Sequence, residues 1–220
     1  MKTKIKPILI GLAVVSIVVF IGYALTRPET APEDPNKPAG SSKVSDKGSN
    51  NVYGKADSPV ILTEFVDFQC EACLGYYPHV KEVKEKYKDK VKFQIRYFPI
   101  TSGHKFAMKA AIAAEAAARQ DKFFAMHDKL FEGQKTWEQT TDPQKYFDQY
   151  AKEIGLNMDK YKKDLENEDV VAVINRDLQD VTELKGEGTP TFLLNGKKIE
   201  NPGPSVEKLS SLLDQALQGQ

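Results

Sequence analysis

Both cysteines of the chain, Cys70 and Cys73, lie at one place, three positions apart. The run Ser58–Phe68 before them is β-branched and aromatic with few polar positions, which is typical of a strand buried on both faces. After them, apolar residues recur at helical spacing as far as Lys90, and Pro78 is expected to kink this helix. Any fold of this sequence therefore has to bring two thiols to the junction of a buried strand and a helix.

A cysteine pair at this spacing can be part of a zinc site, a structural disulfide or a redox-active pair. Zinc needs four ligands, and the chain's histidines, His79, His104 and His127, are not at ligand spacing. A disulfide that closes so short a loop would remove little entropy from the unfolded chain, so stabilisation is a poor reason for the spacing. A redox-active pair is therefore favoured, and no metal is expected.

The two thiols are expected to differ in reactivity. Cys70 would lie at the helix start, where unpaired N–H groups and the positive end of the helix dipole stabilise a thiolate, the form that attacks disulfides. Cys73 would lie one turn further in, more buried and less reactive. Such a pair can form a mixed disulfide at one sulfur and resolve it with the other.

Charge and hydropathy indicate an exported domain. The 31 basic and 31 acidic residues balance, so no basic field points to nucleic acid. The uncharged segment 7–25 is long enough to cross about 30 Å of hydrocarbon, and lysines in residues 1–6 orient it with the N-terminus in the cytoplasm. Residues 26–51 are Pro-, Ser- and Asp-rich and are expected to be a disordered tether. A cleaved signal peptide is the alternative to an anchor, and it would export the domain equally.

The remaining residues, 52–220, are enough for one compact domain. An alternating second strand, "VKFQIRYFPI", completes a strand–helix–strand unit with parallel strands and a right-handed crossover. Ala-rich and amphipathic segments then predict a helical block at about 101–170. These elements together predict an α/β fold.

Strands are expected to return in the C-terminal part. Thr191–Leu194 is predicted to be a strand, and Asn195-Gly196 is typical of a type I′ hairpin turn. Lys197–Glu200 would be the returning strand. Ser205 would then open a final helix with leucines on one face.

"EFVDFQCEAC", joined to "GTPTFLLNG" more than a hundred residues later, resembles the thioredoxin superfamily. The helical block between the two halves resembles its DsbA-like branch of extracytoplasmic thiol–disulfide oxidoreductases. The resemblance covers the chain from about Val52 to the C-terminus. It implies a thioredoxin fold with an inserted helical block of about 70 residues, and a reversible Cys70–Cys73 disulfide.

Three further positions take a role from this resemblance. Pro190 matches the family's cis-proline, which would leave the backbone of Thr189 free to pair with an extended substrate. Glu64 matches a buried acid under the active site, whose raised pKa would let it exchange a proton with Cys73. A solvent-facing acid is the alternative for Glu64, and Asp67 is a second candidate for the same role.

The residues between the cysteines depart from DsbA. Glu71-Ala72 stands where DsbA has Pro-His, and both changes are expected to raise the thiolate pKa and make the disulfide less oxidising. His104 is expected either to line a substrate groove or, more often for such a residue, to be solvated or to cap the first inserted helix.

We therefore predict a membrane-tethered, extracytoplasmic enzyme that forms disulfides in exported proteins by dithiol–disulfide exchange at Cys70 and Cys73. The resemblance implies a quinone-linked membrane partner that reoxidises it. No cofactor is expected, because the dithiol itself carries the electrons, and we expect a monomer. A reductase or isomerase with the same dithiol is the first alternative, and a redox-inert peptide-binding module is the second.

Overall fold

The computed structural model describes residues 48–219. The expected basic tail and membrane anchor, and most of the expected tether, lie outside the described residues. Within residues 48–219 the helices are all too short or too polar to cross a membrane.

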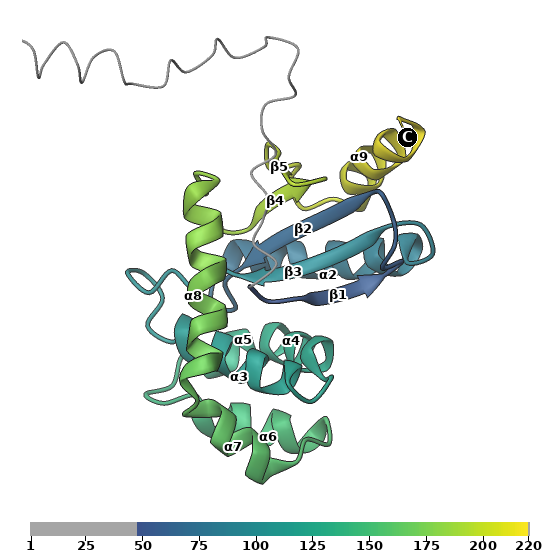
Figure 1. The fold of residues 1–220 in the computed structure, drawn as a ribbon. Coiled ribbons are helices and arrows are strands. Elements are labelled where there is room, and N and C mark those ends of the chain that lie inside the picture. The colour runs from purple at the N-terminus through teal and green to yellow at the C-terminus, as the bar shows by residue number, and fades with distance from the viewer. Residues whose placement is uncertain (1–47, 220) are drawn as a thin grey trace, which may run out of the picture. The chain divides into compact units, whose positions relative to one another are not determined.

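The described residues form one five-stranded mixed sheet and a helical block, which is inserted in the chain between β3 and β4 (Figure 1). The elements in chain order are β1 (Asn51–Gly54), β2 (Ile61–Val66), α2 (Glu71–Tyr87), β3 (Lys92–Tyr97), α3 (Ala107–Ala118), α4 (Phe123–Glu132), α5 (Gln134–Trp137), α6 (Gln144–Glu153), α7 (Met158–Leu165), α8 (Glu168–Glu183), β4 (Thr191–Leu194), β5 (Lys197–Lys198) and α9 (Val206–Gln218). The strand order across the sheet is β1-β3-β2-β4-β5.

The predicted strand–helix–strand unit is confirmed. β2 and β3 are parallel, with Glu64 opposite Ile95, and α2 connects them. The assigned helix α2 continues without a break through Pro78. β4 then pairs antiparallel with β2, so that β2 lies between two partners and nearly all of its residues are buried.

The sequence does not predict β1. Its four residues, Asn51–Gly54, are too few and too polar to show a strand pattern, and they form a strand only by pairing antiparallel with the edge of β3. Gly54 ends the strand at a φ of +84°, and a Cβ there would lie 2.5 Å from the carbonyl oxygen of Val91. Only glycine fits this close approach without strain.

The C-terminal predictions are also confirmed in their main features. Asn195 and Gly196 both have positive φ, at 51° and 79°, as a type I′ turn requires. The returning strand β5 is shorter than predicted and ends at Lys198. Ser205 is the N-cap of α9, and its side chain accepts a hydrogen bond from the backbone N–H of Lys208.

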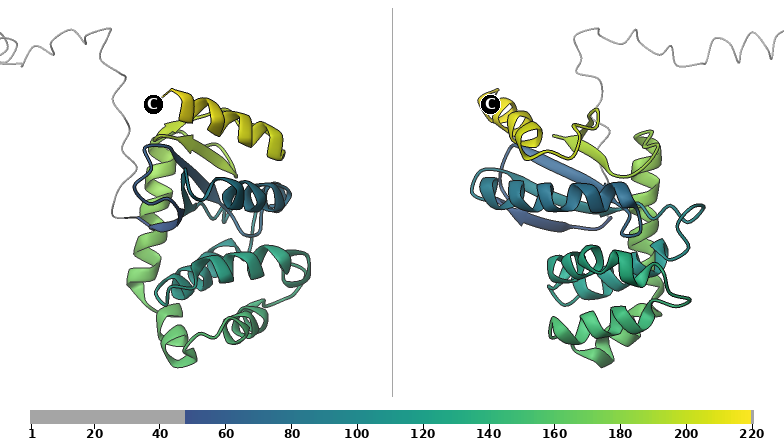
Figure 2. Two further views of the ribbon diagram at one scale, coloured as in Figure 1. Left: turned by 90° about the vertical axis from the view of Figure 1, so that its right-hand side faces the viewer. Right: turned by 180° about the vertical axis from the view of Figure 1, so that it is seen from behind.

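Helices cover both faces of the sheet. α2 and α9 pack together over one face, in a cluster that includes Leu62, Val83, Phe93 and Leu213. α8 runs from the helical block to β4 along the other face, where Val181 contacts Phe65 (Figure 1). The views of Figure 2 show α3 to α7 gathered beyond the β1 edge of the sheet, with α2 crossing in front of the sheet when it is seen from behind.

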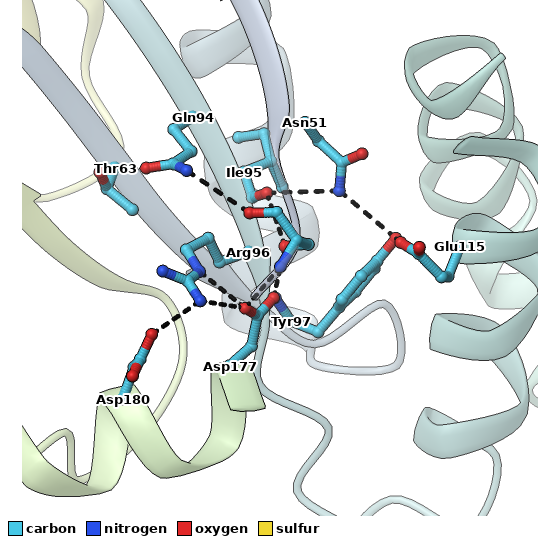
Figure 3. Close-up of polar contacts among 10 residues, drawn as sticks. Asn51, Thr63, Gln94, Ile95, Arg96, Tyr97, Glu115, Asp177 and Asp180 are labelled. Carbon is cyan, nitrogen blue, oxygen red and sulfur yellow. Dashed lines mark hydrogen bonds and ion pairs between the residues drawn. The ribbon is translucent and has the colours of Figure 1, made fainter. Parts of the chain in front are cut away.

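A buried charge network joins α8 to the sheet (Figure 3). Arg96 on β3 is fully buried and pairs with Asp177 and, at 2.7 Å, with Asp180. Asp177 also accepts hydrogen bonds at 2.9 Å from the backbone N–H groups of Ser49 and Tyr97. The network therefore fixes three segments to one another: the residues that precede β1, the end of β3 and the middle of α8.

Candidate active site

Cys70 is the N-cap residue of α2, as the sequence predicts. Its backbone is extended, with φ −76° and ψ 124°, and the helix begins at the next residue. The side chain is partly exposed, whereas Cys73 is only 1% exposed. Both are thiols in this structure. The pair therefore has one accessible and one buried sulfur.

The surroundings of Cys70 favour its thiolate. A hydrogen bond from the Cys73 thiol has the largest effect and, with the backbone N–H groups of Cys73 and Ala72, lowers the pKa of Cys70 to about 5 against the opposing effect of burial. At neutral pH the accessible sulfur is thus largely ionised.

Thr189 contacts Cys70 in a way that depends on the charge of the sulfur. The Cys70 thiol donates to the backbone carbonyl of Thr189 at 3.4 Å. In this state the buried hydroxyl of Thr189 has no hydrogen-bond partner. A thiolate can only accept, and the Thr189 side chain then lowers the pKa of Cys70. The unpaired hydroxyl is therefore positioned to stabilise the reactive form.

Cys73 has the opposite character. Burial, followed by its hydrogen bond to Cys70 and the charges of Cys70 and Glu64, raises the pKa of Cys73 well above its usual value. Such a thiol stays protonated at neutral pH, so a base has to take its proton before it can attack a mixed disulfide.

Glu64 is the candidate for this base. It is 5% exposed, and burial raises its pKa to about 8, an effect that the charge of Lys84 on α2 partly offsets. Because Glu64 also contributes to the raised pKa of Cys73, the two groups are electrostatically coupled. The expectation of a buried acid with a raised pKa agrees with this placement, whereas a solvent-facing carboxylate does not.

Asp67, the second candidate, is in a different situation. Its carboxylate accepts from the backbone N–H groups of Gln69 and Ile100, each at 2.8 Å, and contacts the ring Nδ1 of His104 at 2.7 Å. The carboxylate is thus held by the backbone of two loops and by a histidine ring. His104 neither caps α3, whose N-cap is Phe106, nor lies free in solvent; it is bound to Asp67.

Gln134 on α5 is a site residue that sequence reasoning misses. It is fully buried, and its Nε2 donates to the carbonyls of Phe68 at 2.7 Å and Cys70 at 3.1 Å. The helical block thus holds the backbone just before the helix. A single glutamine in the polar stretch "GQKTWEQTT" carries no pattern that predicts this contact.

A groove beside Cys70 is formed by the loop that contains Pro190. The Thr189–Pro190 peptide bond is cis, as the resemblance implies. The groove has a volume of about 360 Å³. It is lined by Gly188 to Phe192 of this loop and β4, and by Lys198 to Asn201. Cys70 does not line this groove, but its thiol contacts the backbone carbonyl of Thr189, which does.

Metal binding finds no support in the part of the chain that the structure describes. Within residues 48–219, no group of three or more His, Cys, Asp or Glu side chains is placed to hold a metal ion.

Comparisons with known proteins agree with this architecture. A family model described as thioredoxin matches residues 46–215. BdbD from Bacillus subtilis, in its oxidised form, is 26% identical with a TM-score of 0.68, over 77% of this chain and 93% of that chain. The thiol-disulfide exchange protein α-DsbA2 from Wolbachia pipientis is 23% identical with a TM-score of 0.64, over 76% of this chain and 87% of that chain. The chain belongs to the thioredoxin family, and its architecture is that of the DsbA-like thiol–disulfide oxidoreductases.

Curated relatives with similar sequences are longer proteins. The Na+/H+ antiporter NhaA 1 of Mycobacterium sp. strain KMS is 30% identical over 210 residues, which cover 92% of this chain and 33% of that protein. The Na+/H+ antiporter NhaA 3 of Salinispora tropica is 33% identical over 168 residues, or 24% of its length. The chain thus spans about a third or less of the length of these relatives.

Proposed function

We propose that this chain is a membrane-tethered, extracytoplasmic thiol–disulfide oxidoreductase that forms disulfides in exported proteins through Cys70 and Cys73. The observation that carries the proposal is the asymmetry of the pair. An accessible sulfur whose pKa is lowered to about 5 lies next to a buried one whose pKa is raised. Dithiol–disulfide exchange needs one sulfur that is a good nucleophile and leaving group, as Cys70 would be, next to a second thiol that resolves the mixed disulfide, as Cys73 would.

The reaction transfers two electrons from the substrate to the enzyme. A substrate thiolate attacks Cys70 of the Cys70–Cys73 disulfide; a substrate–Cys70 bond forms, and Cys73 leaves and takes a proton from Glu64. A second substrate thiolate then attacks the substrate sulfur of this mixed disulfide. Cys70 leaves as a thiolate, which its low pKa favours. The products are an oxidised substrate and a reduced enzyme, which an external oxidant has to reoxidise.

The oxidising direction is favoured by the stability of the Cys70 thiolate. Stabilising the reduced form makes a disulfide a stronger oxidant. A pKa of about 5 lies between those of thioredoxin, about 7, and DsbA, about 3.5. A disulfide with this thiolate would therefore be a weaker oxidant than DsbA and a stronger one than thioredoxin.

Attachment to a membrane rests on the sequence of the N-terminal part. The uncharged segment 7–25 is the proposed anchor. The 92% match to the Mycobacterium antiporter is longer than residues 48–219 alone, so it extends into this N-terminal part. That relative is named for ion exchange across a membrane. An anchored domain would stay close to a membrane partner that reoxidises it, for which the family resemblance suggests a quinone-linked protein.

Two measurements test the proposal. A Cys73→Ser variant, which cannot resolve mixed disulfides, should accumulate reducible adducts with exported proteins through Cys70, and a Cys70→Ser/Cys73→Ser control should not. If no adducts form, thiol exchange is not the function, and a peptide-binding module becomes the better explanation. A glutathione titration decides the direction: a potential near about −120 mV supports oxidation and one near about −270 mV supports reduction.

A further inference from the structure

The carboxylate of Asp67 is bound by three donors although its side chain has no exposed surface. One oxygen accepts from the backbone N–H of Gln69. The other accepts from the backbone N–H of Ile100 and contacts the ring Nδ1 of His104 at 2.7 Å. Because a carboxylate can only accept, Nδ1 has to carry the proton of the ring. Asp67 thus connects the end of β2 to the loop that follows β3.

A second contact joins the same two loops. The side-chain carbonyl of Gln69 accepts from the backbone N–H of Phe106 at 2.6 Å. The tip of the loop between them, Thr101 to Gly103, is exposed and makes no such contact with the active-site loop. This loop therefore contacts the active-site loop only through its two ends, at Ile100 and at His104 to Phe106, among the hydrogen bonds of the described residues.

The backbone of Asp67 contacts both cysteines. Its carbonyl accepts the N–H of Cys70 at 3.1 Å, which sets the turn that leads into α2. Its N–H interacts with the sulfur of Cys73. Asp67, whose carboxylate contacts His104, thus positions Cys70 through its backbone carbonyl and Cys73 through its backbone N–H.

We propose that Asp67 and His104 are a positioning pair for the active site: the Nδ1–H of His104 holds the Asp67 carboxylate, and Asp67 holds the loop that presents Cys70 to Cys73 and Thr189. This inference rests on the proposed function, since it concerns the same two sulfurs. His104 contacts no reacting atom and is not a catalytic residue. Its side chain is 28% exposed, so a substitution there disturbs little of the core.

The test compares two amides at position 104 in the full-length, reduced chain. Asparagine places an N–H close to the position of Nδ1, whereas glutamine places it close to that of Nε2. The readout is the rate at which iodoacetamide alkylates Cys70 at pH 4, about one unit below the pKa of about 5, together with the pH at half-maximal rate. His104→Asn should react within about twofold of the wild type. His104→Gln should react about tenfold more slowly, which corresponds to a pKa of Cys70 raised by about one unit. Thr101→Ala, at the loop tip, is the matched control and should not differ from the wild type.

Two outcomes would overturn the inference. One is a Gln variant that reacts as fast as the Asn variant, because the bond to Asp67 would then not set the state of Cys70. The other is an Asn variant as slow as the Gln variant, because the ring itself would then matter rather than its Nδ1–H. If the Gln variant does not fold, a slow Asn variant still overturns the inference.

Failure of this inference is distinguishable from failure of the proposed function. Alkylation reports on the sulfur of Cys70 without any substrate or partner. Adduct formation by the Cys73→Ser variant reports on exchange with exported proteins. If the position-104 variants show the predicted alkylation rates but Cys73→Ser forms no adducts, the positioning pair is supported and the proposed function is not. If Cys73→Ser forms adducts but the position-104 variants are alkylated at the wild-type rate, the proposed function is supported and the positioning pair is not.

Discussion

Glu64 shows how one buried residue can serve chemistry at the expense of stability. Burial raises its pKa from 4.5 to about 8. In the unfolded chain this carboxyl ionises near its ordinary pKa, so between pH 4.5 and about 8 the folded protein binds more protons than the unfolded one. The free energy of unfolding therefore falls as the pH rises through this window. We propose proton exchange with Cys73 as the role of this buried acid.

Replacing Glu64 with Gln should stabilise the protein and slow its chemistry. The neutral amide removes the cost of a buried ionisable group, so the free energy of unfolding at neutral pH should rise by about 3 kcal/mol. Resolution of a mixed disulfide at Cys70 should slow, because Cys73 loses its proton acceptor. Denaturant unfolding and stopped-flow reduction of a model disulfide measure the two effects. A variant that is less stable and resolves as fast as the wild type would contradict this role.

Packing between α2 and α4 depends on a histidine kept neutral. His127 is 4% exposed and lies among aromatic rings, with its centroid 5.0 Å from that of Phe131 and 5.7 Å from that of Tyr77. Burial lowers its pKa to about 4, although a hydrogen bond to Asp128 partly opposes this effect. The interface between α2 and the helical block therefore disfavours the protonated form of His127.

The interface between α2 and α4 should weaken in acid. Since His127 has a pKa of 6.5 when unfolded and about 4 when folded, the unfolded chain binds the extra proton between these values. Stability should fall as the pH drops through this window, by about 3 kcal/mol in total. The contribution of Glu64 to stability changes in the opposite direction above pH 4.5. The measurement is therefore the difference in unfolding free energy between the wild type and His127→Gln across the window, in which the Glu64 contribution cancels. Parallel curves for the two proteins would contradict the prediction.

Local sequence predicts the helices, strands and turns of this fold better than it predicts the long-range contacts between them. The strand–helix–strand unit, the hairpin turn at Asn195-Gly196 and the cap at Ser205 all depend on residues close together in the chain. β1 forms only through its partner strand, and Gln134 reaches the carbonyl of Cys70 across 64 positions. Contacts of this kind leave no periodic pattern, so they become visible only in the folded chain.

At the scale of the whole described chain, the buried charges between β3 and α8 connect the sheet to the helical block. Arg96 donates through Nε to Asp177 at 2.7 Å, and both side chains are fully buried. Asp177 also binds the backbone N–H of Ser49, where the chain enters the domain. Removing one charge of a buried pair leaves the other unpaired, which costs far more than losing a surface pair.

Breaking this network should therefore destabilise the whole domain. Arg96→Met and Asp177→Asn should each lower the free energy of unfolding by about 3–5 kcal/mol. The double variant should cost less than the sum of the two, because the two side chains interact directly. Lys129→Met, which breaks the exposed pair with Glu153 at 2.5 Å, is the control and should cost about 1 kcal/mol or less. Additive costs in the double variant would show that Arg96 and Asp177 do not act together.

The proposed thiol exchange depends most directly on the ionisation of Cys70. The measurement is a pH titration of thiolate absorbance in the reduced protein, repeated with Cys70→Ser to assign the sulfur. We expect one thiolate with a midpoint near pH 5, absent from the Cys70→Ser variant, with Cys73 still protonated at neutral pH. A midpoint near the ordinary thiol value of 9.0 would contradict the account, because Cys70 would then be neither the nucleophile nor the leaving group that the exchange requires.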